Sequence, residues 1–180
     1  MRQLLILYCS LLICFIAFAD AESDFNEGYK YHSRKEYKQA LEYFTKSADQ
    51  GNPEAQSALG VLFYYGEGIK QNFKKAVYWY EKSAEQGNAN AQYNLGSMYC
   101  IGNSLFTIDF KKARYWFRKA AEQGNTQGKL FLEMMTVLGQ GTLLNYKERL
   151  KYLSDSEKLR NAASKRGINT IRLLKAANKF

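Results

Sequence analysis

Few side chains in this sequence could carry out catalysis. The only histidine is His32, which rules out a two-histidine metal site and an H-E-x-x-H helix. The chain contains no G-x-S-x-G, S-x-x-K or Walker motif. Cys100 could pair with His32 only across two separate copies of a repeated segment, so we interpret Cys100 as a structural cysteine. We therefore expect no enzymatic activity, no metal and no cofactor.

Two short aromatic runs, at residues 78–80 and 115–117, could form a stacking platform for sugars or bases. Three consecutive residues of a helix face different directions, so such a run does not present one flat surface. Tyr80 and Phe117 fall on the packing stripe of their helices. We expect core positions for these two residues, and we expect the two tryptophans to fill gaps between repeats.

The aromatic runs belong to a segment that occurs three times. It is spelled EYFTKSADQGN, YWYEKSAEQGN and YWFRKAAEQGN, and the copies end at residues 52, 88 and 125. In the units that end at residues 88 and 125, an A-Q-x-x-L-G block precedes a glycine-marked break, which is followed by F-K-K-A. Self-similarity at a spacing of 36 and then 37 residues indicates a repeat architecture, in which each unit packs on its neighbours.

Each unit is predicted to form two helices. The chain has one proline and few Val or Ile outside its first twenty residues, which disfavours strands. Gly60 and Gly96 interrupt an apolar helical pattern, where we expect another helix backbone to approach closely. The letters QGN predict a helix-to-helix corner, with Gly87 as a left-handed cap and Asn88 as the N-cap of the next helix. Pro53 suits a first helical position.

The units resemble Sel1-like repeats, which are relatives of the tetratricopeptide repeat. The resemblance rests on the A-Q-x-x-L-G block, the F-K-K-A segment and the E-Q-G-N corner, and it is strong for the second and third units. The first unit looks closer to a tetratricopeptide unit, and the fourth is a weak match. The resemblance implies an all-α fold, a right-handed α-solenoid of antiparallel helix pairs. We divide the chain into a signal peptide (1–19), a degenerate first repeat (20–52), two Sel1-like repeats (53–88 and 89–125), a degenerate fourth repeat (126–168) and a C-terminal capping helix (169–180).

The N-terminus predicts export. An apolar run at residues 4–19 follows Arg2 and ends in Ala17-Phe18-Ala19, which suits cleavage after Ala19. The run has 16 residues, fewer than the roughly 20 that cross a bilayer. We expect a bacterial protein that is periplasmic or secreted, monomeric, and freed of its signal peptide.

Basic charge gathers toward the C-terminus. Residues 20–141 hold 15 basic and 14 acidic side chains, whereas residues 142–180 hold 10 basic and 3 acidic. An exported protein rarely meets nucleic acid, so we expect no nucleic-acid partner. We interpret the basic residues as a solvated helix face, and contact of this region with an anionic membrane or an acidic protein stays as the alternative.

First-helix positions outside the packing stripe are the candidates for partner binding. In related helical-repeat arrays the first helices line the concave face, and the resemblance implies the same here. A solvated face would carry Lys and Glu, whereas most of these residues are aromatic or apolar, which favours an interaction surface. Offsets from the central glycine of each unit select Phe25, Tyr29, His32, Ser57, Val61, Tyr64, Tyr65, Tyr93, Ser97, Cys100 and Ile101.

We expect an exported adaptor or scaffold that binds a protein partner in this groove. One alternative is a periplasmic immunity protein that neutralises a secreted, type VI lipase-like toxin, a link that the resemblance brings. Another is a weak β-lactam hydrolase or binder. This chain lacks the paired cysteines of the family members with that activity.

Overall fold

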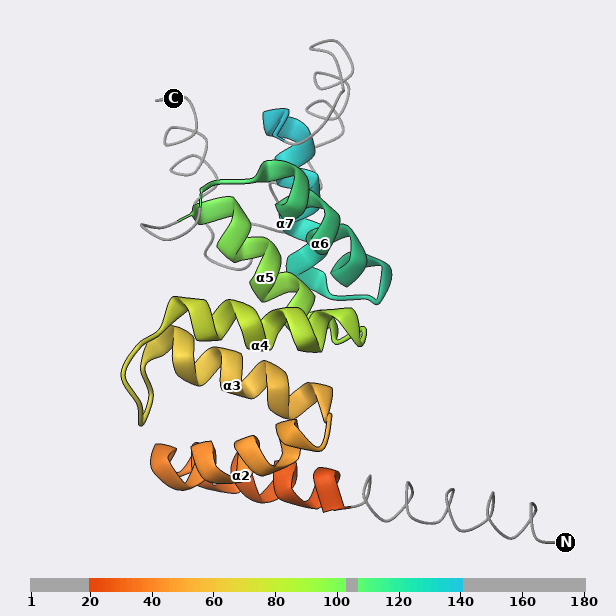
Figure 1. Ribbon diagram of the computed structural model, residues 1–180. Helices are drawn as coiled ribbons and strands as arrows, with labels where there is room; N and C mark the ends of the chain where they lie inside the picture. The colour runs from red at the N-terminus through yellow and green to blue at the C-terminus, as the bar shows by residue number, and fades with distance from the viewer. Residues whose placement is uncertain (1–19, 103–106, 141–180) are drawn as a thin grey trace, which may run out of the picture. The chain divides into compact units, whose positions relative to one another are not determined.

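The computed structural model describes residues 20–102 and 107–140, and within these ranges it contains helices and no strand (Figure 1). Residues 20–33 are helical. Further helices of 13 residues each follow: α2 (Tyr37–Asp49), α3 (Pro53–Tyr65), α4 (Phe73–Glu85), α5 (Ala89–Ile101), α6 (Phe110–Glu122) and α7 (Thr126–Leu138). The predicted all-α class, built from consecutive helix pairs, is confirmed.

Several predicted segments lie outside the described residues. These are the signal peptide (1–19), the C-terminal capping helix (169–180) and most of the fourth repeat. Of that repeat, the structure describes α7, which ends at Leu138 and is followed by Gly139 in the left-handed region with φ of 72°.

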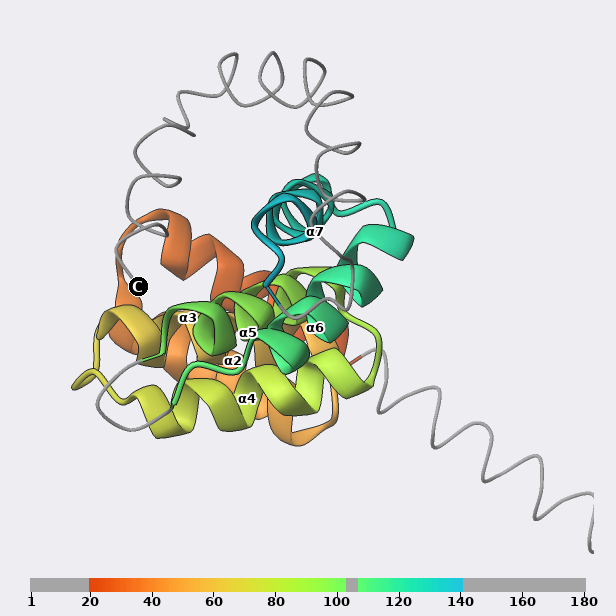
Figure 2. The same cartoon turned by 90° about the horizontal axis from the view of Figure 1, so that it is seen from above.

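The chain divides into two compact units, residues 1–92 and 93–180, and α5 spans the boundary between them. In the first unit α3 packs against both α2 and α4, and the two views in Figures 1 and 2 show α3 and α4 side by side. In the second unit α6 packs against α7. Each unit thus contains helix pairs formed by neighbours in the sequence.

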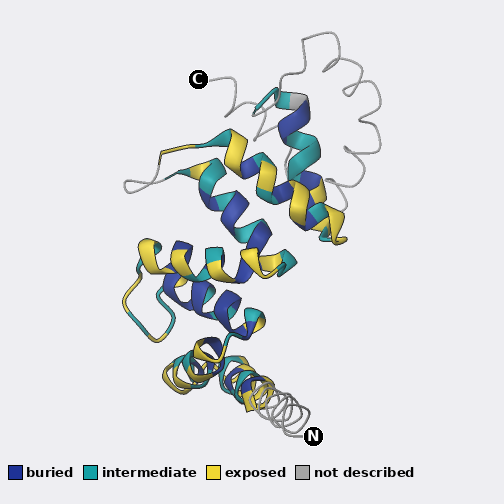
Figure 3. Cartoon of the chain, turned by 45° about the vertical axis from the view of Figure 1, so that its right-hand side comes forward, coloured by how far each residue is buried: buried dark blue, intermediate teal, exposed yellow. Residues whose placement is uncertain are grey.

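Each unit has an apolar cluster of its own. In Figure 3, α3 is mostly dark blue, whereas α4 shows yellow along one side, so α3 is the central helix of the first unit and α4 keeps a solvent-facing side. The second unit's cluster joins α6 to α7 through Ala113, Phe117 and Met135, each fully buried. The first unit's cluster joins α2 to α3 through Ala40, Phe44, Ala48, Ala55, Leu59 and Leu62.

The predicted corner between repeats is confirmed. Gly87 has a φ of 97°, a backbone conformation that glycine adopts at little cost. The side chain of Asn88 then accepts a hydrogen bond of 2.9 Å from the backbone N–H of Ala91, which caps α5. Asn52 and Asn125 cap α3 and α7 in the same way, both at 2.8 Å. The corner is therefore a local structure, which the letters QGN specify without help from distant residues.

The central glycines of the first unit make room for aromatic rings. A Cβ added to Gly28 would come within 2.6 Å of the Phe44 ring, and one added to Gly60 would overlap the Tyr80 ring. The expectation that another helix backbone approaches at Gly60 is therefore wrong in this detail, because the nearest atoms belong to a side chain of α4. Because glycine has no Cβ, the aromatic ring of the second helix can lie against the backbone of the first helix. The two helices of a repeat therefore pack closely.

Hydrogen bonds from buried side chains join the helices. Within a repeat, the hydroxyl of Ser83 in α4 donates to the carbonyl of Pro53 in α3 at 2.6 Å, and the hydroxyl of Ser47 donates to the carbonyl of Ala21 at 2.6 Å. Between repeats, the buried amide of Gln56 donates to the carbonyl of Ala48 at 3.2 Å. Gln92 repeats this contact with the carbonyl of Ala84 at 3.0 Å. The glutamine of the A-Q-x-x-L-G block thus ties each repeat to the one before it.

Candidate interaction surface

The predicted partner-binding residues occupy four positions relative to the central glycine of each first helix, which is Gly28, Gly60 or Gly96. Position −3 lies three residues before the glycine, and positions +1, +4 and +5 lie after it. All of these residues belong to the described part of the chain. Those up to Tyr65 lie in the first unit and those from Tyr93 lie in the second, so each unit is considered by itself. The four positions differ in how far they are exposed.

Position −3 points into the core. The ring centroid of Phe25 lies 5.8 Å from that of Phe44. Ser57 is buried, and the ring of Tyr93 lies 5.9 Å from that of Phe117, a core residue of the second unit. These side chains therefore make their main contacts within the fold, and position −3 contributes to stability.

Position +4 is half-buried. The Nε2 atom of His32 lies 3.1 Å from a carboxylate oxygen of Glu67, which holds the loop between α3 and α4 against the first repeat. The ring of Tyr64 lies 5.5 Å from that of Phe73. Cys100 packs against the core of the second unit, and burial raises the pKa of its thiol. A raised pKa lowers the thiolate fraction, so Cys100 is not an activated nucleophile.

Position +5 faces solvent, whereas position +1 is exposed only at Tyr29. Tyr29 is 62% exposed, Tyr65 is 66% exposed and Ile101 is 68% exposed, whereas Val61 and Ser97 are half-buried. Residues four apart on a helix lie one above the other on the same face. Positions +1 and +5 therefore form one strip along each first helix. We refer to these five residues as the first-helix surface.

Two of the helices that carry the first-helix surface, α3 and α5, are almost free of charge. α3 has one charged residue, Glu54, in its first turn, and α5 has none. By contrast, α4 holds five charged residues and α6 holds six. A helix face that only meets water usually carries charged side chains. The absence of charge beside exposed apolar residues is typical of a surface that another molecule covers.

The exposed ring of Tyr65 is held in place by its neighbours. It meets the ring of Tyr64 edge to face, with a centroid distance of 4.9 Å and an interplanar angle of 82°. The side-chain amide of Gln71 donates to the carbonyl of Tyr64 at 2.7 Å, which holds the following loop close to this turn. A ring positioned before binding loses less conformational entropy when a partner covers it.

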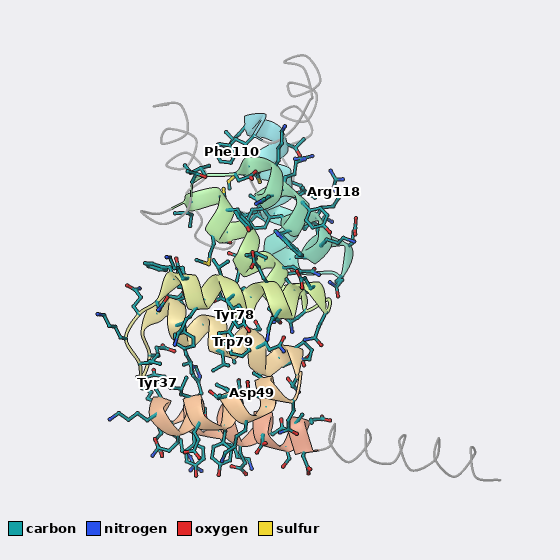
Figure 4. All side chains as sticks on the ribbon, viewed as in Figure 1. Tyr37, Asp49, Tyr78, Trp79, Phe110 and Arg118 are labelled. Atoms are coloured by element: carbon teal, nitrogen blue, oxygen red, sulfur yellow. The ribbon has the colours of Figure 1, made fainter. Side chains whose placement is uncertain are left out.

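The prediction for the aromatic runs of the second helices is confirmed for Tyr80, Phe117 and Trp79, and for Trp116 it stays a prediction. Tyr80 and Phe117 are buried, and burial raises the pKa of Tyr80. Trp79 packs against a cluster formed by α2 and α3, which places it between two repeats. Tyr78 is 49% exposed, and Figure 4 shows it beside Trp79 on α4.

A sugar-stacking or base-stacking role for this aromatic run gains no support. The Lys82 ammonium lies 4.8 Å from the ring centroid of Tyr78 and 5.2 Å from that of Trp79. A lysine of the same helix thus occupies the ring faces that a sugar or a base would need. The sequence analysis did not predict this contact. A signal for it was present, because a lysine three residues after an aromatic residue also occurs at Tyr43 and Lys46. There the Lys46 ammonium lies 4.9 Å from the ring centroid of Tyr43.

Two features are absent from the described residues. They contain no group of three or more His, Cys, Asp or Glu side chains that could hold a metal ion. None of the helices in residues 20–102 and 107–140 is long and apolar enough to cross a membrane. The apolar run at 4–19 lies outside these ranges.

Two solved structures are similar to this chain. A Sel1 repeat protein from Oxalobacter formigenes is 36% identical, with a TM-score of 0.65 over 75% of this chain and 55% of the other. The protein c5321, a protective antigen present in uropathogenic Escherichia coli strains that displays an SLR fold, is 34% identical, with a TM-score of 0.67 over 77% of this chain and 30% of the other. The chain thus spans about half of the first protein and less than a third of the second. No curated protein matches the chain.

A family model described as the Sel1 repeat matches residues 25–52, 53–88 and 89–125. The first of these segments looked closer to a tetratricopeptide unit, and the family model places it with the other two. Its boundaries coincide with the Asn-capped corners at Asn52, Asn88 and Asn125. Since the three matches together cover more than half of the 180 residues, the chain belongs to the Sel1 repeat family.

Proposed function

We propose that this chain is an exported adaptor that binds a protein partner through the first-helix surface. The main support is the exposure of Tyr65 and Ile101, which occupy equivalent positions in α3 and α5. Both side chains are about two-thirds exposed, on helices with almost no charge. Covering apolar area of this kind gains about 25 cal/mol per Å². Tyrosine adds a polar tip, which makes it frequent among residues that dominate binding.

A purely structural role does not account for these two residues. Neither belongs to the core of its unit, whereas position −3 in the same helices packs inward. In solenoids of this family type the first helices line the concave face, which is the surface that partners use. The proposal therefore assigns recognition to positions +1 and +5 and stability to position −3.

Export is the second part of the proposal. It is supported by the apolar run at 4–19 and by the small residues Ala17 and Ala19 before a cleavage point. Protein recovered from the producing cell should begin at Asp20 when its N-terminus is sequenced. Recovery of the intact N-terminus from the cytoplasm would contradict the proposal of export. It would not affect the proposed binding surface, which is tested separately.

The binding surface is tested by two matched double variants. Tyr65→Ala with Ile101→Ala removes the exposed apolar side chains of the first helices. Tyr78→Ala with Tyr115→Ala removes two tyrosines of the second helices that are 49% and 53% exposed. Both variants should unfold within about 1 kcal/mol of the unmodified chain, since all four side chains lie at the surface.

The readout is affinity for a purified partner. A partner is first recovered from envelope extracts by crosslinking to the unmodified chain, and its Kd is then measured by titration. The first variant should weaken Kd by about tenfold or more, because exposed aromatic and large apolar anchors carry most binding energy. The second should leave Kd unchanged. Equal losses in both variants, or no loss in the first, would contradict the proposal.

A further inference from the structure

We propose that the outer face of α6 binds an anionic membrane surface. This face consists of Lys111, Lys112, Tyr115, Arg118 and Lys119, all exposed. At 100° per residue these five side chains fall within an arc of about 120° of the helix, and the exposed Glu122 lies within the same arc. The buried residues Ala113, Phe117 and Ala120 lie on the opposite side. The α6 face thus shares no residue and no helix with the first-helix surface.

The charge of the two units differs strongly. Residues 1–92 hold 10 basic and 11 acidic side chains, a net charge of −1. Residues 93–180 hold 16 basic and 6 acidic side chains, a net charge of +10. The chain's whole formal charge of +9 therefore comes from the second unit. The described part of the second unit holds six basic residues, and five of them lie in α6.

The basic side chains of the α6 face are not neutralised by neighbours. Lys111, Lys112, Arg118 and Lys119 form no ion pair with any residue in the described ranges. Glu122, in the last turn, is the only acidic residue of the helix. Figure 4 shows Arg118 extending away from the helices. Exposed, unpaired basic charge on one helix face attracts a polyanionic surface.

The equivalent faces of the other second helices lack this excess. In α4 the face reads Lys74, Lys75, Tyr78, Glu81 and Lys82, so Glu81 stands where α6 has Arg118. In α2 it reads Lys38, Gln39, Glu42, Thr45 and Lys46, and Lys46 pairs with Glu42 at 2.9 Å. Including the last-turn acidic residue of each helix, the net charges are 0 for α2, +1 for α4 and +3 for α6. The helices α2 and α4 can therefore serve as comparisons for the charge of α6.

A lipid surface fits the α6 face better than an acidic protein does. Long basic side chains without ion-pair partners among the described residues suit mobile headgroups, whereas a protein partner gains most from basic side chains already held in place. Tyr115 is 53% exposed between these charges, and tyrosine prefers the headgroup level of a bilayer. Lys119 lies 5.9 Å from the Tyr115 ring centroid, so the basic and aromatic groups are presented together. A flat membrane also requires no pocket on the protein.

Vesicle sedimentation with the full chain tests this proposal. The lipid is phosphatidylglycerol mixed with phosphatidylcholine, and pure phosphatidylcholine vesicles measure the contribution of the apolar run at 4–19. Lys111→Gln with Lys112→Gln should weaken binding to the anionic vesicles by about 25-fold, since each basic residue near an anionic surface contributes about a factor of five. Arg118→Glu, which makes the α6 face equal to the α4 face, should weaken binding by a similar factor because it changes the charge by two units.

The matched control is Lys74→Gln with Lys75→Gln. Lys75 lies 5.1 Å from the ring centroid of Phe63, and Lys112 lies 5.1 Å from that of Tyr99, so the two variants remove the same charge and the same type of contact. The control should change vesicle binding by less than about twofold, because Lys74 and Lys75 are not part of the proposed contact.

Three outcomes would overturn the proposal. Equal losses in the α4 and α6 variants would mean that binding follows net charge alone. Binding to anionic vesicles that survives both α6 variants would assign it to another part of the chain. Binding to polyglutamate but not to the vesicles, lost in the α6 variants, would assign the face to an acidic protein. Thermal unfolding of each variant shows that a loss is not caused by unfolding.

Discussion

The ring of Phe117 in α6 lies directly on the backbone of Gly96 in α5. A Cβ added to Gly96 would come within 2.9 Å of two ring carbons of Phe117 and within 3.2 Å of the carbonyl oxygen of Ala113. The first unit contains the same arrangement, with Gly60 under the ring of Tyr80. Glycine in the first helix and an aromatic ring in the second therefore form one packing device, and each residue explains the other.

This relationship predicts the effect of Gly96→Ala. Alanine is the better helix former by about 1 kcal/mol, which favours the substitution. The added methyl group overlaps a fully buried ring, and overpacking costs about 1 to 3 kcal/mol. Since Phe117 is enclosed and cannot move aside, we expect a net loss of about 1 kcal/mol in the free energy of unfolding, measured by urea denaturation.

The control for this prediction is the same substitution in a Phe117→Leu background. Removing the ring should remove most of the clash, so the two substitutions should be non-additive. A gain in stability for Gly96→Ala in the unmodified chain would show that helix propensity decides at this position. The same cost in both backgrounds would show that Phe117 is not the obstacle.

The corner between repeats could be predicted from the sequence because its causes are local. Gly87 needs only a backbone without a Cβ, and Asn88 caps a helix that begins at the next residue. The exposure of the first-helix residues could not be predicted in this way. Whether Tyr93 points into the core or into solvent depends on where Phe117 lies, more than twenty residues later. Offsets from the glycine place both Tyr93 and Ile101 on the candidate list, but only the packed structure separates them.

A second prediction concerns the glutamine of the A-Q-x-x-L-G block. The amide nitrogen of Gln86 donates to the side-chain oxygen of Gln56 at 2.7 Å, and Gln56 in turn donates to the carbonyl of Ala48. Gln56 is buried, so Gln56→Ala should lower the free energy of unfolding by about 1 to 3 kcal/mol. Gln86→Ala should cost less, because its side chain is exposed.

The double variant of Gln56 and Gln86 measures their coupling. We expect an interaction free energy of about 0.5 to 1 kcal/mol, since each single substitution already removes the hydrogen bond that the two share. A cycle between Gln56 and Gln71, whose amide bonds to the carbonyl of Tyr64 instead, serves as the control and should show additivity. Additive costs for Gln56 and Gln86 would mean that their contact contributes nothing to stability.

The third prediction concerns the reactivity of Cys100. Burial raises the pKa of its thiol, so at pH 8 its thiolate fraction is lower than that of an exposed cysteine. Alkylation by iodoacetamide should be slow in the folded chain, rise as the pH approaches the raised pKa, and become faster in urea. Mass mapping separates the Cys100 peptide from those of Cys9 and Cys14. Faster alkylation of the folded chain than of the unfolded chain would identify an activated thiol and revive a catalytic interpretation.

The fourth prediction separates the two roles within the first helices. Tyr93 packs between Phe117 and Phe131, with centroid distances of 5.9 and 5.7 Å, so Tyr93→Ala removes two ring contacts and leaves space beside the core. We expect it to lower the free energy of unfolding by about 2 to 4 kcal/mol. Tyr65→Ala removes a ring that is 66% exposed and should change the same quantity by less than about 1 kcal/mol. Urea denaturation of both variants, with partner affinity measured on the folded fraction, distinguishes them. If Tyr65→Ala proved as destabilising as Tyr93→Ala, its exposure would reflect a structural requirement, and the first-helix surface would lose its strongest support.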